Sequence, residues 1–119
     1  MLPLLRIDIN VVETLPPDFE ASGRKKYAVL LNPYGGPGSQ SVNRKFIRDW
    51  HHHLVCEHKI IVLTVDGRGT GFKGRSFRNW VRDDLGRYEV IDQVNAAKEW
   101  AKKRYIDNKR IGIWGWVSR

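Results

Sequence analysis

A serine close to the C-terminus is the first residue that could act as a nucleophile. Residues 110–114 have the composition of a strand, and Gly-Trp-Val-Ser-Arg follows directly at residues 115–119. A sharp strand-to-helix turn that reads Gly-x-Ser-x-Gly exposes a nucleophilic hydroxyl, because small flanking residues permit the strained backbone. Val117 and Arg119 stand where the serine and the second glycine belong. We therefore interpret Ser118 as a terminal residue without a positioned base, and not as a nucleophile.

Four histidines offer ring nitrogens for metal binding or proton transfer. His51, His52 and His53 are consecutive, so on a helix their side chains point about 100° apart and cannot converge as ligands four residues apart do. We expect them on a solvated helix end. His58 stands alone in a connection before a strand, where a histidine is usually a surface residue. The sequence therefore predicts no metal site and no cofactor.

A glycine-rich turn and a group of acidic residues complete the candidates. The turn Asp-Gly-Arg-Gly-Thr-Gly at residues 66–71 lacks both the GxGxxG spacing and the lysine-serine pair of phosphate-binding loops. Asp83, Asp84, Glu89 and Asp92 precede and open a helical segment, where carboxylates usually serve as caps and dipole partners. We expect structural roles for both groups.

The hydrophobic pattern predicts the elements that would position these residues. Strands are expected over residues 6–14, 27–31, 59–65 and 110–114, and helices over 41–54 and 88–105. From Tyr27 onward strands and helices alternate, which implies a parallel sheet with right-handed crossovers. Trp114 and Trp116 are expected to pack in the core and against the final turn. The prediction is an α/β protein whose mostly parallel sheet is truncated at the nucleophile turn.

The composition suits a single folded domain. Of the 119 residues, 41% are hydrophobic and 11% aromatic, enough for a packed core. The net charge of +8 would attract anions, but the basic residues are scattered and no nucleic-acid-binding signature accompanies them, so nucleic-acid binding ranks last. A single cysteine, Cys56, excludes an internal disulfide. Arg6 and Asp8 interrupt the apolar start, so we expect no membrane contact by this chain.

Three motifs give the sequence a family resemblance. They are Tyr-Gly-Gly-Pro-Gly-Ser-Gln at residues 34–40, Val-Asp-Gly-Arg-Gly-Thr-Gly at 65–71 and Asp-Asn-Lys-Arg-Ile-Gly-Ile-Trp-Gly-Trp at 107–116. In this order and at these separations they resemble the prolyl oligopeptidase family, and within it the dipeptidyl peptidase IV subfamily that includes the fungal dipeptidyl aminopeptidases. The resemblance implies an α/β-hydrolase fold. Residues 1–119 would form the N-terminal portion of that catalytic domain, without its C-terminal half and without the family's β-propeller.

The resemblance also implies a function, that of a serine-type dipeptidyl peptidase. Such hydrolases remove dipeptides with Pro or Ala second from the N-terminus of a peptide substrate. In the family the tyrosine of the first motif donates its hydroxyl to the tetrahedral oxyanion, so Tyr34 inherits that role. The nucleophile, the Asp and the His of the triad are absent from this sequence, and we expect the chain alone to be inactive. Family members are commonly membrane-anchored in vacuolar, secretory or cell-surface compartments, and the location of this chain stays open.

The departure from the family pattern at Val117 has several explanations. The splice-donor consensus encodes Val-Ser in frame, so residues 117–119 could be translated intron sequence or a wrongly assigned gene end; a true truncation or a frameshift would give the same protein. A truncated product would act only through association with a partner or with itself, including as a homodimer, because an unfinished sheet exposes an edge and apolar surface.

Overall fold

The computed structural model of the chain describes residues 8–34, 38–71 and 73–116. Gly35, Gly36 and Pro37 of the first motif lie outside the described residues, as do Val117, Ser118 and Arg119. The elements follow in the order β1 (Asn10–Thr14), β2 (Tyr27–Leu31), α1 (Trp50–His58), β3 (Ile61–Asp66), α2 (Arg75–Asn79), α3 (Arg87–Ala101) and β4 (Ile106–Ile113).

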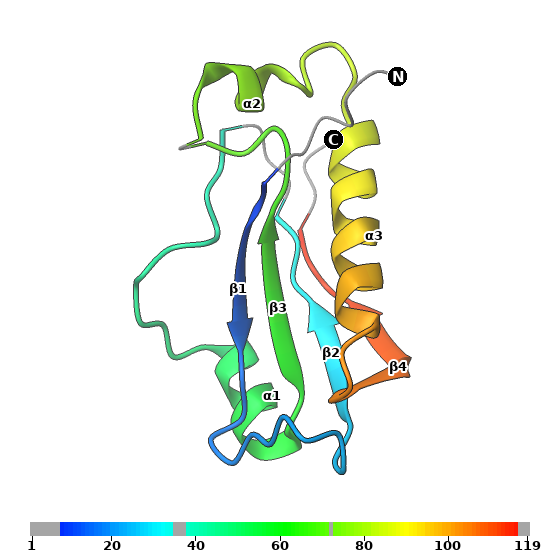
Figure 1. The fold of residues 1–119 in the computed structure, drawn as a ribbon. Helices are drawn as coiled ribbons and strands as arrows, with labels where there is room; N and C mark the ends of the chain where they lie inside the picture. The colour runs from blue at the N-terminus through cyan, green and yellow to red at the C-terminus, as the bar shows by residue number, and fades with distance from the viewer. Residues whose placement is uncertain (1–7, 35–37, 72, 117–119) are drawn as a thin grey trace.

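The four strands form one mixed sheet with the order β1-β3-β2-β4 (Figure 1). β2 pairs in parallel with both β3 and β4, whereas β1 pairs antiparallel with β3. The mostly parallel sheet expected from the sequence is therefore confirmed. The carboxyl ends of β2, β3 and β4 meet at one edge of the sheet, the upper edge in Figure 1. Loops that follow parallel strands share that edge, where ligands of open α/β sheets bind.

Helices lie on both faces of the sheet. Alternate side chains of β2 and β3 point to one face and form the main core together with Ala96 of α3 and Ile106 of β4. Val62 of β3 points to the opposite face and is also buried, as is Val55 of α1. This layering of helix, sheet and helix is the α/β architecture. The strand side chains of the main core are Tyr27, Val29, Leu31, Ile61, Leu63 and Val65.

The helix expected over residues 41–54 is wrong for its first nine positions. Asp49 is the N-cap of α1, because its carboxylate accepts the His52 backbone N–H at 3.1 Å. Upstream, the side chain of Asn43 accepts the Lys45 backbone N–H at 2.8 Å, a local bond that competes with helix formation. Phe46 is 80% exposed. The three- and four-residue spacing of apolar residues was therefore a coincidence in this segment.

The end of α3 and the start of β4 also differ from the sequence prediction. Helix periodicity continues to Tyr105, but α3 ends at Ala101. The backbone N–H of Tyr27 donates to the Tyr105 carbonyl at 2.8 Å, and Tyr27 pairs with Ile106. Residue 105 is therefore bound to the sheet and does not belong to the helix, and β4 begins earlier than expected. The short helix α2 was not predicted at all.

The contact between Tyr105 and Glu13 predicts a loss of stability at alkaline pH. The Tyr105 hydroxyl donates to the Glu13 carboxylate at 2.9 Å. Burial, the hydrogen bond and the charge of Glu13 raise the pKa of Tyr105 to about 12 from 10.0. Because the folded state holds the proton more tightly, this contribution to stability is complete below about pH 10 and is lost as the pH rises through about 12.

Urea unfolding from about pH 9 to about pH 12 checks this prediction when the wild-type chain is compared with Tyr105→Phe. The free-energy difference between the two chains should stay constant up to about pH 10 and then turn against the wild type. A difference that does not change with pH would contradict the assigned contact.

Candidate functional site

The pairing of β2 with β4 continues beyond the ends of both strands. Trp114 donates its backbone N–H to the Leu31 carbonyl at 2.9 Å, and Trp116 donates to the Pro33 carbonyl at 3.2 Å. Tyr34 and Trp116 then form an isolated parallel bridge. Tyr34 is 44% exposed, so a reacting molecule can reach it. The structure thus brings the candidate oxyanion donor beside the residue that precedes position 117, where the hydrolase motif has its serine.

Gly115 permits this close approach. A Cβ atom at position 115 would lie 2.2 Å from the Pro33 carbonyl oxygen, far inside van der Waals contact, so only glycine fits. On either side of it, Trp114 and Trp116 are 67% and 76% exposed. The prediction that the two tryptophans pack in the core is therefore wrong for the described residues, and their expected packing against the final turn involves residues 117–119, which lie outside them. β4 is an edge strand in the described part of the chain, and no described element covers its outer side.

The loop after Tyr34 is hydrogen-bonded to the loop after β3. Gly38 donates its backbone N–H to the Gly69 carbonyl at 2.9 Å, and Gly71 donates to the Ser39 carbonyl at 2.8 Å. The Ser39 hydroxyl is 3.4 Å from the Tyr34 carbonyl, which accepts its hydrogen bond. A Cβ atom at Gly71 would lie 2.7 Å from the Gly38 carbonyl oxygen. The two loops therefore fit together only because glycine occupies this position.

The carboxylate of Asp66 fixes the continuation of the first loop. It is 2% exposed and accepts the backbone N–H of Ser41 at 3.1 Å and that of Val42 at 2.8 Å. Two backbone donors satisfy a charge that would be costly to bury without partners. Asp66 is the last residue of β3, so this contact connects the first loop to the sheet itself.

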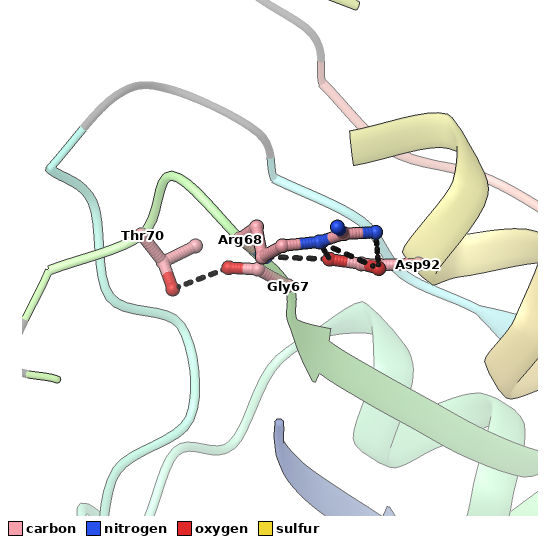
Figure 2. A network of polar contacts seen from close by, with 4 residues as sticks. All are labelled: Gly67, Arg68, Thr70 and Asp92. Atoms are coloured by element: carbon pink, nitrogen blue, oxygen red, sulfur yellow. Dashed lines mark hydrogen bonds and ion pairs between the residues drawn. The ribbon is translucent and has the colours of Figure 1, made fainter. Parts of the chain in front are cut away.

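Arg68 and Asp92 form a buried ion pair between the loop after β3 and helix α3 (Figure 2). Their side chains are 10% and 8% exposed. The guanidinium of Arg68 donates Nη2–H to Asp92 Oδ1 at 2.8 Å and Nε–H to Asp92 Oδ2 at 3.0 Å, while the Arg68 backbone N–H donates to Oδ2 at 2.7 Å. These hydrogen bonds raise the pKa of Arg68 above its ordinary value. Such a bidentate, charge-assisted pair is among the stronger polar contacts in proteins.

Aromatic rings complete the surroundings of Arg68. Its guanidinium carbon lies 4.5 Å from the centre of the Tyr88 ring and 5.4 Å from that of Trp80, within range of a cation–π interaction. Within the same loop the Thr70 hydroxyl donates to the Gly67 carbonyl at 2.8 Å (Figure 2). Hydrogen bonds therefore connect the turn at residues 66–71 to α3 and to the loop after Tyr34, in agreement with the structural role that the resemblance implies.

The structure divides the acidic residues that the sequence analysis had grouped. Glu89 is a helix cap, as expected, because its carboxylate accepts the Gly86 backbone N–H at 2.9 Å. Asp84 pairs with Arg87 at the surface. Asp92 does not serve as a cap; it belongs to the buried pair with Arg68. One signal could have shown this: Asp92 lies four residues before Ala96, on the helix face that packs into the core, and a carboxylate on that face needs a partner.

The three consecutive histidines lie at one end of α1, as expected, in its first turn, where His53 is exposed. His51 and His52 are half-buried, and His51 Nδ1 is 3.4 Å from the Asp49 carboxylate.

Over residues 8–34, 38–71 and 73–116, no group of three or more His, Cys, Asp or Glu side chains is placed to hold a metal ion. The same ranges contain no helix with the length and apolar character to span a membrane.

Comparison with known proteins decides the family. The model of the prolyl oligopeptidase family matches residues 46–117. The chain belongs to the prolyl oligopeptidase family. Its similarity to individual members extends over nearly the whole sequence. It is 52% identical over 109 residues to a protein of Trichophyton verrucosum named "Probable dipeptidyl-aminopeptidase B", and 54% identical over 108 residues to the protein of the same name from Arthroderma gypseum. These alignments cover 92% and 91% of this chain but 12% of each relative.

A solved structure of a family member confirms the fold. Dipeptidyl peptidase 4 of Porphyromonas gingivalis superposes with a TM-score of 0.85 at 39% sequence identity, over 92% of this chain and 15% of the other. The sheet and its helices therefore form part of an α/β-hydrolase fold, as the resemblance implied. This prolyl oligopeptidase family chain spans about an eighth of the length of its fungal relatives.

Proposed function

We propose that the chain is the first part of the catalytic domain of a serine-type dipeptidyl peptidase. The complete enzyme would release N-terminal dipeptides with Pro or Ala second from peptide substrates. The names of the fungal relatives and of the Porphyromonas gingivalis structure support this activity. Within the enzyme, Tyr34 would donate its hydroxyl to the oxyanion of the tetrahedral intermediate.

The bridge between Tyr34 and Trp116 is the observation that carries this proposal. An oxyanion donor must lie within hydrogen-bond distance of the carbonyl oxygen that becomes negatively charged when the nucleophile attacks the neighbouring carbon. The bridge brings Tyr34 beside Trp116, the residue before position 117, where the motif has its nucleophile. The glycine that this approach requires is present at position 115.

We also propose that the 119 residues alone have no peptidase activity. Val117 stands where the motif has its nucleophile, and loss of a triad member lowers kcat by roughly 10⁴- to 10⁶-fold. The transcript across the codons for Trp116 and Val117 shows whether a spliced message restores Trp-Ser-x-Gly-Gly. A dipeptidyl anilide with Pro second should be cleaved by the product of that message and not by the 119-residue chain. Cleavage by the short chain would contradict the assignment of the nucleophile.

Tyr34→Phe in the full-length product tests the role of Tyr34. Removal of one oxyanion donor should lower kcat by about 100-fold and leave KM nearly unchanged, because the hydroxyl acts in the transition state. Tyr105→Phe is the matched control, because it also removes a tyrosine hydroxyl. Tyr105 directly precedes the amino end of β4, and its hydroxyl donates to Glu13. Equal activity of the Tyr34→Phe enzyme and the wild type would contradict the proposed role.

A second candidate function is association without catalysis. The edge strand β4 and the segment after it expose Ile113, Trp114 and Trp116, an apolar patch of the kind that partners cover. Sedimentation of the 119-residue chain over a range of concentrations tests this candidate. A dimer that dissociates on substitution of Trp114 by Arg would support it, and a monomer at all concentrations would count against self-association.

A further inference from the structure

The buried pair Arg68–Asp92 connects helix α3 to the loop after β3, and that loop supports the segment that follows Tyr34. Four hydrogen bonds from the main chain and side chain of Arg68 end on the Asp92 carboxylate. On α3, the side-chain amide of the next residue, Gln93, donates to the Val65 carbonyl at 3.0 Å. Helix α3 therefore contacts both the carboxyl end of strand β3 and the loop that follows it.

The same loop makes the contacts that hold the segment after Tyr34. The Gly69 carbonyl accepts the backbone N–H of Gly38, and the backbone N–H of Gly71 donates to the Ser39 carbonyl. The glycines on both sides of Thr70 therefore hydrogen-bond to the segment after Tyr34. Ser39 in turn is hydrogen-bonded to the Tyr34 carbonyl. A continuous series of hydrogen bonds thus runs from Asp92 on α3 through the loop after β3 to the backbone of Tyr34.

We propose that Arg68 and Asp92 are positioning residues for Tyr34, holding the loop that orients the oxyanion donor although neither side chain belongs to the reacting groups. The proposal rests on the proposed function, because it gives the second loop a task in catalysis. Catalytic geometry tolerates little error, and a displacement of about 1 Å can lower the rate by about 100-fold. Two facing loops connected through glycine backbones provide such accuracy only when one of them is fixed to a rigid element.

The appropriate variant removes the polar connection without leaving a buried charge alone. The double variant Arg68→Met with Asp92→Leu replaces both partners by apolar side chains, a change that folded proteins often tolerate, whereas removal of one partner leaves an uncompensated charge. Glu99→Gln is the matched control on the same helix, because it breaks only the exposed pair of Glu99 with Lys102.

Amide hydrogen exchange of the 119-residue chain gives a readout that needs no enzymatic activity. In the double variant, protection of the Gly38 and Gly71 amides should fall at least about tenfold, while that of Asn32 and Trp114, which donate within the sheet to Leu63 and Leu31, changes less than about threefold. A uniform fall at all four amides would show a purely structural role, and no change at Gly38 and Gly71 would show no coupling. Either result overturns the proposal.

Kinetics of the full-length product separate this proposal from the proposed function. With the anilide substrate, the double variant should lower kcat by about tenfold or more with little change in KM, and Glu99→Gln should match the wild type. An inactive wild-type enzyme would refute the proposed function but leave the exchange result intact. An active wild type with an equally active double variant would refute the positioning role alone.

Discussion

Substitution of Gly115 by alanine should open the bridge between Tyr34 and Trp116. The new Cβ would lie 2.2 Å from the Pro33 carbonyl oxygen and 2.8 Å from Pro33 Cδ. To keep the bridge with such overlap would cost about 3 kcal/mol, whereas the hydrogen bond from Trp116 to Pro33 contributes only about 1 kcal/mol. The overlap outweighs the bond, so the segment should separate. Exchange protection of the Trp116 amide should be lost, and the full-length product should lose at least about 100-fold in kcat.

Gly112→Ala is the control for Gly115→Ala, because both glycines lie on the same stretch of chain. At Gly112 the nearest atom to an added Cβ is Leu30 Cδ1 at 3.7 Å, an ordinary contact. Alanine there should be neutral or stabilising by up to about 1 kcal/mol, since glycine weakens a strand. If Gly115→Ala kept the Trp116 amide protected to the same degree as Gly112→Ala does, the close approach to Pro33 would be incorrect.

Loss of Asp92 alone should destabilise the chain more than any surface substitution. Asp92→Ala leaves the Arg68 guanidinium, 10% exposed in the structure, without its partner, and removal of one member of a buried pair costs about 3–5 kcal/mol. Glu99→Ala, which breaks an exposed pair on the same helix, should cost less than about 1 kcal/mol. Urea unfolding of both variants measures the two values.

The double variant Arg68→Met with Asp92→Leu serves as a second comparison for Asp92→Ala. It should recover much of the lost stability, because no charge remains unpaired in the interior. If Asp92→Ala and Glu99→Ala lowered the free energy of unfolding equally, the pair would not be buried in solution. If the double variant were as unstable as Asp92→Ala, packing around the pair and not its charge would determine the effect.

The sequence was sufficient for the parts of the fold that depend on strong patterns. β2 was predicted at its observed bounds because five consecutive apolar residues suit a strand of a parallel sheet; one face of the strand is buried and the other is half-buried. The helix expected at residues 41–49 was wrong because the Asn43 and Asp66 side chains accept backbone hydrogen bonds in that segment. The spacing of apolar residues does not reveal either contact. Trp114 and Trp116 were expected to pack in the core and against the final turn because they flank Gly115 on an expected central strand, but both are exposed because β4 lies at the edge of the described sheet.

The candidate site was predictable only where a motif carried it. Tyr34 came from the family resemblance, and its position beside Trp116 agrees with the role proposed for it. The helix spacing could show that Asp92 faces the core and needs a partner, but it could not identify that partner, because Arg68 lies 24 residues away in another loop. Contacts between distant segments determine such roles, and local sequence patterns do not encode them.

The strand order has a consequence for how the chain is made. In the described part of the chain, β2 and β3 are the only strands consecutive in sequence that are neighbours in the sheet, and they pair in parallel, so no hairpin can form first. Tyr27 can pair only after Ile106 has been synthesised, and Asn10 only after Asp66 has been synthesised. At ribosomal rates of about 5–20 residues per second, β2 emerges on the order of ten seconds before β4 exists. During that interval its apolar side chains are exposed, so slower growth at low temperature or a chaperone that binds nascent chains should raise the soluble yield.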